Sequence, residues 1–212
     1  RVAFRTVNIY DHDGRPIMTL NIIRIVTEND VTQDTVNLEH EQAKKLIGHY
    51  GEHGQAVIEL FIPADENDPA DELILSLPVE SLQAFAAEGF TLDIRTDHVS
   101  LYLSRQSIVD AEEGIRFGIS RISDPIQQEH IDHLLEQTAG EDARRVGDSI
   151  RIEGSPSEQT RITLPLNFIE WSDDPLQQQA FLASLNVWIH HSNGDIVFDE
   201  GMLVFSADGS PK

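Results

Sequence analysis

Apolar and polar residues alternate most clearly between residues 73 and 104, and the rest of the chain is interpreted around this stretch. Leucines at every second position of 73–77 predict a strand, which Pro78 ends because proline cannot donate a ladder hydrogen bond. Over 79–88 the apolar spacing changes to that of a short amphipathic helix. Alternating runs resume over 91–103 and predict a hairpin.

The same order of strand, proline, helix and hairpin recurs later in the chain. A strand over 159–164 ends at Pro165, a helix is predicted over 176–185, and alternating runs over 186–199 form a second hairpin. A third, looser version comes earlier, with its strand, helix and strand over 35–38, 39–50 and 56–63. Reuse of one small unit is typical of a structural array, and chance similarity of short patterns is the alternative.

The remaining segments predict more strands and one more helix. Alternating runs over 2–10 and 17–27 flank an Asp-Gly turn and predict a hairpin. Further strands are predicted over 115–120, 149–153 and 202–206, and a helix over 126–137. About ten strands and four helices, with hairpins outnumbering crossovers, predict an α+β fold of mainly antiparallel mixed sheets. We expect two lobes, 1–104 and 105–212, or one continuous domain.

Charge and composition exclude several classes of function. The 212 residues include 37 acidic and 15 basic ones, for a net charge of −22. Such a surface repels nucleic acid and anionic membranes, so we expect neither nucleic-acid binding nor membrane insertion. Cysteine is absent, which excludes thiol chemistry, and no apolar run reaches the roughly 18–20 residues that span a bilayer. The first residue, Arg1, indicates a processed product or part of a longer protein.

Motifs that carry catalytic chemistry are missing from the sequence. There is no G-x-S-x-G, P-loop or H-E-x-x-H sequence, and the carboxylates are too numerous for one acid–base pair to be singled out. We therefore expect no enzymatic activity.

The acidic loop before residue 73 is the best candidate for binding a cofactor. Ca²⁺ prefers roughly six to eight oxygen ligands, and this loop supplies several at close spacing. The candidate calcium ligands are Asp65, Asn67, Asp68 and Asp71. A solvated turn is the alternative interpretation, and no cofactor other than calcium is expected.

Three patterns in the sequence resemble a known type of module. They are an L-x-[LI]-P step before a helix, a strand–turn–strand after it, and a closing Asp-Gly-Ser. They occur in the segments 56–63, 73–104, 115–134, 150–166, 186–194 and 200–212. The chain, from about residue 17 onward, resembles a module of large exported surface proteins of Paenibacillus-type Gram-positive bacteria that carry S-layer homology domains.

This resemblance implies an extracellular structural module at the bacterial cell surface. In such proteins the S-layer homology domains bind the cell-wall polymer, so wall binding is expected only through domains outside this chain. The resembling module has no catalytic residues to transfer. It runs on into another strand beyond the equivalent of Lys212, which predicts that a sheet of this chain lacks one strand.

An incomplete sheet offers an edge that a neighbouring molecule can complete. The predicted edge residues are Val2, Phe4, Val7, Leu203 and Phe205. We expect a non-catalytic assembly module that joins copies of itself, or neighbouring surface-protein domains, through these edges.

The alternative function is a glycan- or protein-binding module of the adhesin type. Trp171 lies in an insert outside the repeated unit, where its ring could contact a sugar or a partner. Packing of Trp171 over the helix predicted at 176–185 is the structural alternative, whereas Trp188 lies in an alternating strand and is expected in the core.

Overall fold

The computed structural model describes residues 1–154, 160–166 and 169–204, which contain 12 strands and five helices. The predicted α+β class is confirmed. The chain divides into two compact units, Arg1–Ile122 with Ser149–Leu164, and Ser123–Asp148 with Pro165–Lys212. This division differs from the predicted boundary between residues 104 and 105, because strands that follow residue 105 pair into the sheets of the first unit.

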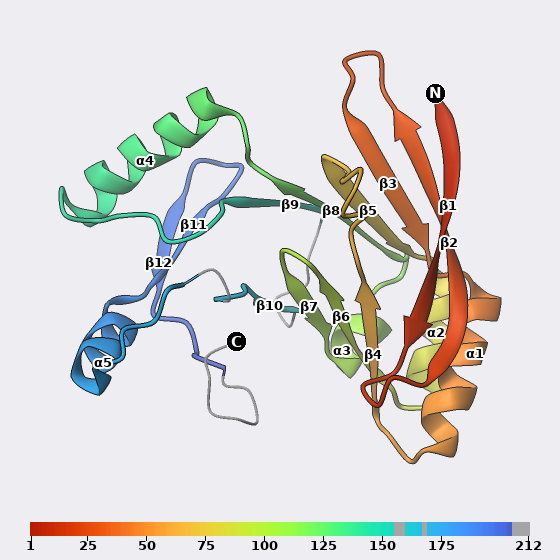
Figure 1. The fold of residues 1–212 in the computed structure, drawn as a ribbon. Helices are drawn as coiled ribbons and strands as arrows, with labels where there is room; N and C mark the ends of the chain where they lie inside the picture. The colour runs from red at the N-terminus through yellow and green to blue at the C-terminus, as the bar shows by residue number, and fades with distance from the viewer. Residues whose placement is uncertain (155–159, 167–168, 205–212) are drawn as a thin grey trace. The chain divides into compact units, whose positions relative to one another are not determined.

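The first unit contains a six-stranded sheet (Figure 1). In spatial order its strands are β1 (Val2–Tyr10), β2 (Pro16–Val26), β3 (Thr32–Asn37), β5 (Glu72–Leu77), β8 (Ile115–Arg121) and β9 (Ile150–Gly154). β1 and β2 form the hairpin that the alternation predicts. β3 and β5 are parallel and the other neighbours are antiparallel, so the sheet is mixed and mainly antiparallel, as expected.

A second, four-stranded sheet belongs to the same unit. Its order is β10 (Thr160–Thr163), β7 (Ser100–Leu103), β6 (Thr91–Thr96) and β4 (Val57–Ile62). β6 and β7 form the hairpin predicted over 91–103, and β10 pairs antiparallel with β7. β4 is the parallel neighbour of β6, although β5 and α2 separate them in the chain.

Two consecutive strand–helix–strand units connect these sheets. β3 leads through α1 (His40–Glu52) to β4, and β5 leads through α2 (Val79–Ala87) to β6. The first strands of the two units are parallel neighbours in the larger sheet, and the second strands are parallel neighbours in the smaller one. The looser copy of the predicted repeat is therefore the one that packs beside the central copy.

The inward faces of both sheets and the two helices share one hydrophobic core. α1 contributes Leu46 and Tyr50, and α2 contributes Leu82 and Phe85, because residues three or four apart lie on one face of a helix. Burial raises the pKa of Tyr50 to about 12, and its hydroxyl donates to the carbonyl of Glu59 at 2.6 Å. Each large apolar side chain in this core stabilises the unit by roughly 1.5–3 kcal/mol.

A short helix, α3 (Arg105–Val109), lies where the sequence analysis predicts only a boundary. The hydroxyl of Ser104 accepts the backbone N–H of Ser107 at 3.1 Å and so caps this helix. Gly114 then adopts a φ of 90° before β8, and a Cβ there would lie 2.8 Å from the carbonyl oxygen of Leu77. Glycine is required at this position because a side chain would clash with the backbone of the neighbouring strand.

The second unit contains α4 (Pro125–Ala139), α5 (Pro175–Ser184), and a hairpin of β11 (Val187–His190) and β12 (Ile196–Asp199). Asp124 and Asp174 cap the two helices, each with a proline in the first turn. Trp188 Nε1 donates to Thr138 Oγ1 at 3.2 Å and joins the hairpin to α4. No residue of this unit that the structure describes is buried, so Trp188 is not the core residue that its strand predicts.

The second strand–Pro–helix–hairpin copy reproduces the order of the central copy but not its packing. β10 belongs to a sheet of the first unit, whereas α5 and its hairpin belong to the second unit. α2 buries Leu82 and Phe85, and α5 has no buried residue. The strand predicted over 202–206 is not formed at 202–204, and its last two residues lie outside the described part of the chain.

Replacing Leu75, which is fully buried in β5, by alanine is expected to lower the free energy of unfolding of the first unit by about 2–5 kcal/mol. Leu176→Ala is the matched control, because this leucine on α5 is 76% exposed and its loss should change stability by less than about 0.5 kcal/mol. Urea unfolding followed by far-UV circular dichroism measures both variants. Equal losses in the two variants would contradict this location of the core.

Candidate functional site

The acidic loop between β4 and β5, predicted to bind calcium, directs its side chains to protein partners. Asp68 Oδ2 accepts a hydrogen bond from Arg24 Nη1 at 2.6 Å, and Asp71 Oδ2 accepts the backbone N–H of Thr32 at 2.7 Å. Asp65 Oδ1 accepts a backbone N–H of the loop itself at 3.1 Å. The carboxylates thus hold the loop against the larger sheet and do not converge on one point.

Asn67, the remaining candidate calcium ligand, supplies the backbone N–H that Asp65 accepts. In the part of the chain that the structure describes, no three His, Cys, Asp or Glu side chains form a group that could hold a metal ion. Calcium binding stays a prediction, and the loop has a structural explanation without it.

Asp34 of β3 forms a buried ion cluster with arginines from β1 and β2. Arg24 Nε and Nη2 donate to its two carboxylate oxygens at 2.7 and 2.8 Å, and Arg5 Nη2 donates to Oδ2 at 2.9 Å. Burial alone would raise the pKa of Asp34, but the hydrogen bonds from Arg24 and then Arg5 outweigh it and hold this pKa below its usual range. The cluster therefore ties three strands together with a carboxylate that stays ionised.

β1 is an edge strand, because it pairs only with β2 among the described strands. Arg1 and Val26 exchange backbone hydrogen bonds of 3.1 and 2.8 Å. Since bonded and non-bonded pairs alternate in an antiparallel ladder, the backbone groups of Val2, Phe4 and Thr6 point away from β2. Phe4 is 74% exposed, and Val2 is exposed beside it. Two of the predicted edge residues therefore lie on an open, apolar strand edge.

The other predicted contact residues lie elsewhere. Val7 is 8% exposed and packs in the core, so it is not an interface residue in this fold. Leu203 lies outside any strand, and Phe205 lies outside the described residues. Trp171 makes an edge-to-face contact with Phe181 of α5, with ring centroids 5.9 Å apart, which agrees with the structural alternative for this tryptophan.

A groove of about 650 Å³ lies where β1 and the turn after it approach the outer face of the smaller sheet. Its lining residues are Asn8, Tyr10, Asp11, His12, Glu59, Phe61, Pro63, Arg95, Thr96 and Ser100. Glu59 and Phe61 point outward because their neighbours on β4, such as Leu60, point into the core. A groove of this size, with aromatic walls and a few polar groups, is typical of small-molecule sites.

Asp11 fixes the wall of the groove that the β1–β2 turn forms. Its Oδ1 accepts the backbone N–H groups of Asp13 and Arg15 at 3.0 and 2.9 Å, and its Oδ2 lies 2.6 Å from Arg15 Nε and 2.9 Å from His49 Nε2. Burial would raise the pKa of Asp11, but the backbone N–H of Arg15 and then the side chains of His49 and Arg15 hold it well below its usual range. The turn is thereby held rigidly on α1.

Arg95 of β6 differs from the other arginines of the first unit's interior. Its Nε is buried and has no hydrogen-bond partner among the described residues. It lies opposite Phe61 in the parallel pair of β6 and β4. The sequence analysis did not predict Arg95 as a site residue, because the sequence shows only that it takes an outward position in an alternating strand.

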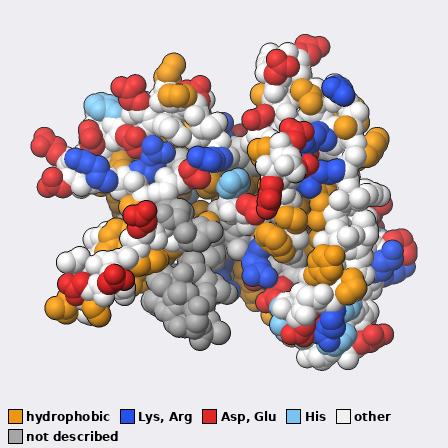
Figure 2. All heavy atoms as spheres, in the orientation of Figure 1, with side chains coloured by type: hydrophobic (Ala, Val, Ile, Leu, Met, Phe, Trp, Pro, Cys, Tyr) orange, Lys and Arg blue, Asp and Glu red, His pale blue; other side chains and the backbone are white. Residues whose placement is uncertain are grey.

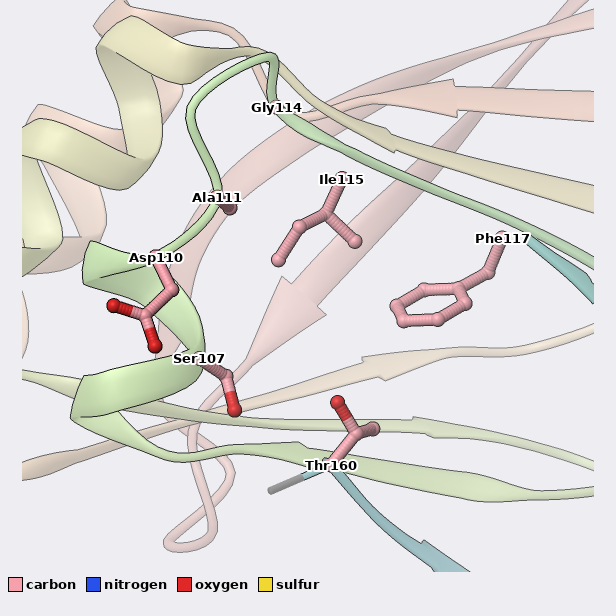
Figure 3. A pocket seen from close by; sticks show the side chains of 7 residues that line it. All are labelled: Ser107, Asp110, Ala111, Gly114, Ile115, Phe117 and Thr160. Carbon is pink, nitrogen blue, oxygen red and sulfur yellow. The ribbon is translucent and has the colours of Figure 1, made fainter. Parts of the chain in front are cut away.

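A second, smaller pocket of about 130 Å³ lies beside α3 (Figure 3). Ile115 and Phe117 point into it from β8, and the hydroxyls of Ser107 and Thr160 lie at its rim. At about 30 Å³ per water molecule, this pocket has room for only a few waters. We therefore regard the larger groove, and not this pocket, as the candidate ligand site.

The surface of the chain carries charges of both signs. Figure 2 shows acidic side chains distributed over the visible face and interspersed with basic ones. None of the helices in the described part of the chain has the length and hydrophobicity that crossing a bilayer requires. No family model, no curated protein and no solved structure matches this chain.

Because Asp68 and Asp71 are bound to protein partners, we expect the melting temperature to be the same in EDTA and in excess Ca²⁺. Thermal unfolding followed by circular dichroism checks this. A rise of several degrees in Ca²⁺ that disappears in Asp65→Asn, whose side chain has no cationic partner among the described residues, would instead support the predicted calcium site.

The free energy of unfolding is expected to fall as the pH drops below about 4, the pKa of an unfolded aspartate. The folded pKa values of Asp34 and Asp11 lie lower, so the stability that they contribute is present above the unfolded pKa and is lost as the pH falls toward the folded one. Urea unfolding at a series of pH values measures this dependence.

Asp34→Asn should flatten this pH dependence and cost about 3–5 kcal/mol at neutral pH, because two arginines lose their buried partner. Asp65→Asn is the control and should keep the pH dependence of the unaltered chain. An unchanged acid response in Asp34→Asn would contradict the role given to the ion cluster.

Proposed function

We propose that this chain is a non-catalytic structural module that joins copies of itself by adding the β1 strand of one copy to the β1 edge of another. The observation that carries the proposal is the open edge of β1, where the backbone groups of Val2, Phe4 and Thr6 face away from β2 beside an exposed aromatic ring. Unpaired strand edges of this kind are templates for pairing with another chain.

Natural edge strands are usually protected, and β1 has little of this protection. Bulges, prolines and outward charges commonly block edge-to-edge pairing. The register of β1 with β2 is regular from Val2 to Ile9 and shifts only between Ile9 and Tyr10. The charged residue within the strand, Arg5, is directed inward and bound to Asp34, so it does not charge the free edge. An approaching strand therefore meets an even row of donors and acceptors.

The exposed side chains along the edge add apolar contact to the backbone hydrogen bonds. Phe4 and Val2 lie opposite Ile23 and Ile25 of β2, on the face of the sheet away from the core. Antiparallel pairing of two β1 strands would bring the same patch of both copies together, as a two-fold interface requires. The resemblance to modules of exported surface proteins supports an extracellular bacterial surface as the setting for this assembly.

The net charge of −22 makes the copies repel one another in dilute salt. Because salt screens this repulsion within about 10 Å at 0.1 M, the proposed association should strengthen as the salt concentration rises. An interface held mainly by ion pairs would weaken under the same change. The salt response therefore distinguishes edge pairing from an electrostatic contact.

Sedimentation velocity over a range of protein concentrations is expected to show a reversible dimer of the unaltered chain, favoured by salt. Thr6→Pro should abolish it while keeping the fold, because the N–H that is lost points away from β2 and proline is tolerated at such edge positions. Phe4→Lys should weaken the dimer by at least roughly tenfold, because it places a charge among the side chains that the dimer would bury.

Ile126→Lys is the matched control, since this residue is as exposed as Phe4 but lies on α4 of the second unit. It adds the same charge away from the edge and should leave the dimer unchanged. A strictly monomeric chain at high concentration and high salt would overturn the proposed function. So would a dimer that Thr6→Pro leaves intact.

A further inference from the structure

We propose that the groove beside β1 binds a small molecule that carries one carboxylate, and that Arg95 is the residue that recognises it. The site is built entirely from the first unit: its lining residues come from β1 and its turn, from β4 and Pro63 after it, and from Arg95, Thr96 and Ser100 of β6 and β7. This inference does not depend on self-assembly, because it uses the groove and not the free edge of β1.

Arg95 is the cation of this groove, and its Nε is shielded from solvent. Its Nε is buried without an acceptor among the described residues, whereas the arginines of the neighbouring cluster, Arg24 and Arg5, are both bound to Asp34. A buried donor without a partner is costly, and for a guanidinium the cost is larger. A ligand carboxylate would supply the missing acceptor, since its two oxygens match the planar fork of an arginine.

The walls of the groove suit the uncharged part of such a ligand. Tyr10 is 50% exposed and Phe61 is 43% exposed, so both rings present large apolar surfaces within a groove of about 650 Å³. Pro63 extends the wall on the β4 side. Exposed aromatic surface that lines a concave site stacks against the flat faces of sugars or the side chains of amino acids.

The remaining charges favour a single carboxylate over a phosphate. Glu59 lines the same groove, and it forms no ion pair with Arg95 within the described residues. The carboxylate of Asp11 forms its ion pair with Arg15 and a hydrogen bond with His49, so it leaves Arg95 available. A doubly charged ligand would be repelled by Glu59 and by the net charge of −22, whereas a monoanion needs only the one free arginine.

The groove is held in shape before any ligand arrives. Asp11 fixes the turn that carries Tyr10 and His12, through its bonds to Arg15 and His49. In the smaller sheet, Thr96 Oγ1 donates to the carbonyl of Val99 at 2.9 Å and fixes the β6–β7 turn. Walls that are already ordered reduce the entropy that a ligand must offset on binding.

The test is a titration of the full, isotope-labelled chain followed by amide NMR, with two carboxylates as probes. D-glucuronate represents an acidic sugar, and N-acetyl-phenylalanine represents an amino-acid or peptide carboxylate. Glucose and N-acetyl-phenylalanine amide are their uncharged counterparts. We expect at least one carboxylate to shift amides of β1, β4 and β6 at millimolar concentration while its uncharged counterpart does not, and the probe that binds identifies the source of the ligand.

Arg95→Gln should weaken this binding by roughly tenfold to a hundredfold, because hydrogen bonds between charged groups are lost. Arg95→Lys keeps the positive charge but loses the planar guanidinium. Its affinity for the probe should lie between those of the unaltered chain and of the Arg95→Gln variant. Arg161→Gln is the matched control: this arginine lies on β10 of the same sheet, 4.5 Å from the centre of the Tyr102 ring, and is not part of the groove. It should bind the probes as the unaltered chain does.

Circular dichroism melting curves of each variant establish that the fold is kept. Two results would overturn the proposal: no amide shift in the groove with either carboxylate, or equal affinity of the Arg95→Gln variant and the unaltered chain. Binding of the uncharged counterparts with the same affinity would also overturn it, because the carboxylate would then play no part.

Discussion

Two sheets bury their apolar faces in one hydrophobic core, and this burial holds the first unit together. Neither sheet could cover its apolar face alone, and the crossings through α1 and α2 bring the two faces together. The parallel pairs of β3 with β5 and of β4 with β6 follow from this arrangement, because both crossings start in one sheet and end in the other. Leu46 and Phe85 close the core on the helical side.

The two sheets contact each other at β1 and β4 without forming a ladder there. Side chains cross this seam in place of backbone pairs: Arg5 Nη2 donates to the carbonyl of Pro63 at 3.3 Å, and Arg24 binds Asp68 of the loop after β4. The groove with Arg95 lies beside this contact, and β1 has no ladder partner on its other side among the described strands.

The two units differ in how much apolar surface they bury. The first has a continuous core, whereas the second has no buried residue in its described part and exposes Ile126 and Leu176 on its helices. Its order depends more on local features, such as the caps at Asp124 and Asp174 and the contacts of Trp171 and Trp188. The two copies of the strand–Pro–helix–hairpin order therefore pack differently, because packing depends on whether each helix has an apolar surface to pack against.

The local elements and the α+β class could be predicted from the sequence alone. The alternation of Leu73, Leu75 and Leu77, followed by Pro78, predicts β5 and its end, because these properties depend on side chains a few residues apart. The folded structure was needed to show that Val7 packs in the core, that Asp68 accepts a hydrogen bond from Arg24, and that Arg95 shares a groove with Tyr10. Strand order and register set these neighbours, and they depend on long-range burial that no local pattern encodes.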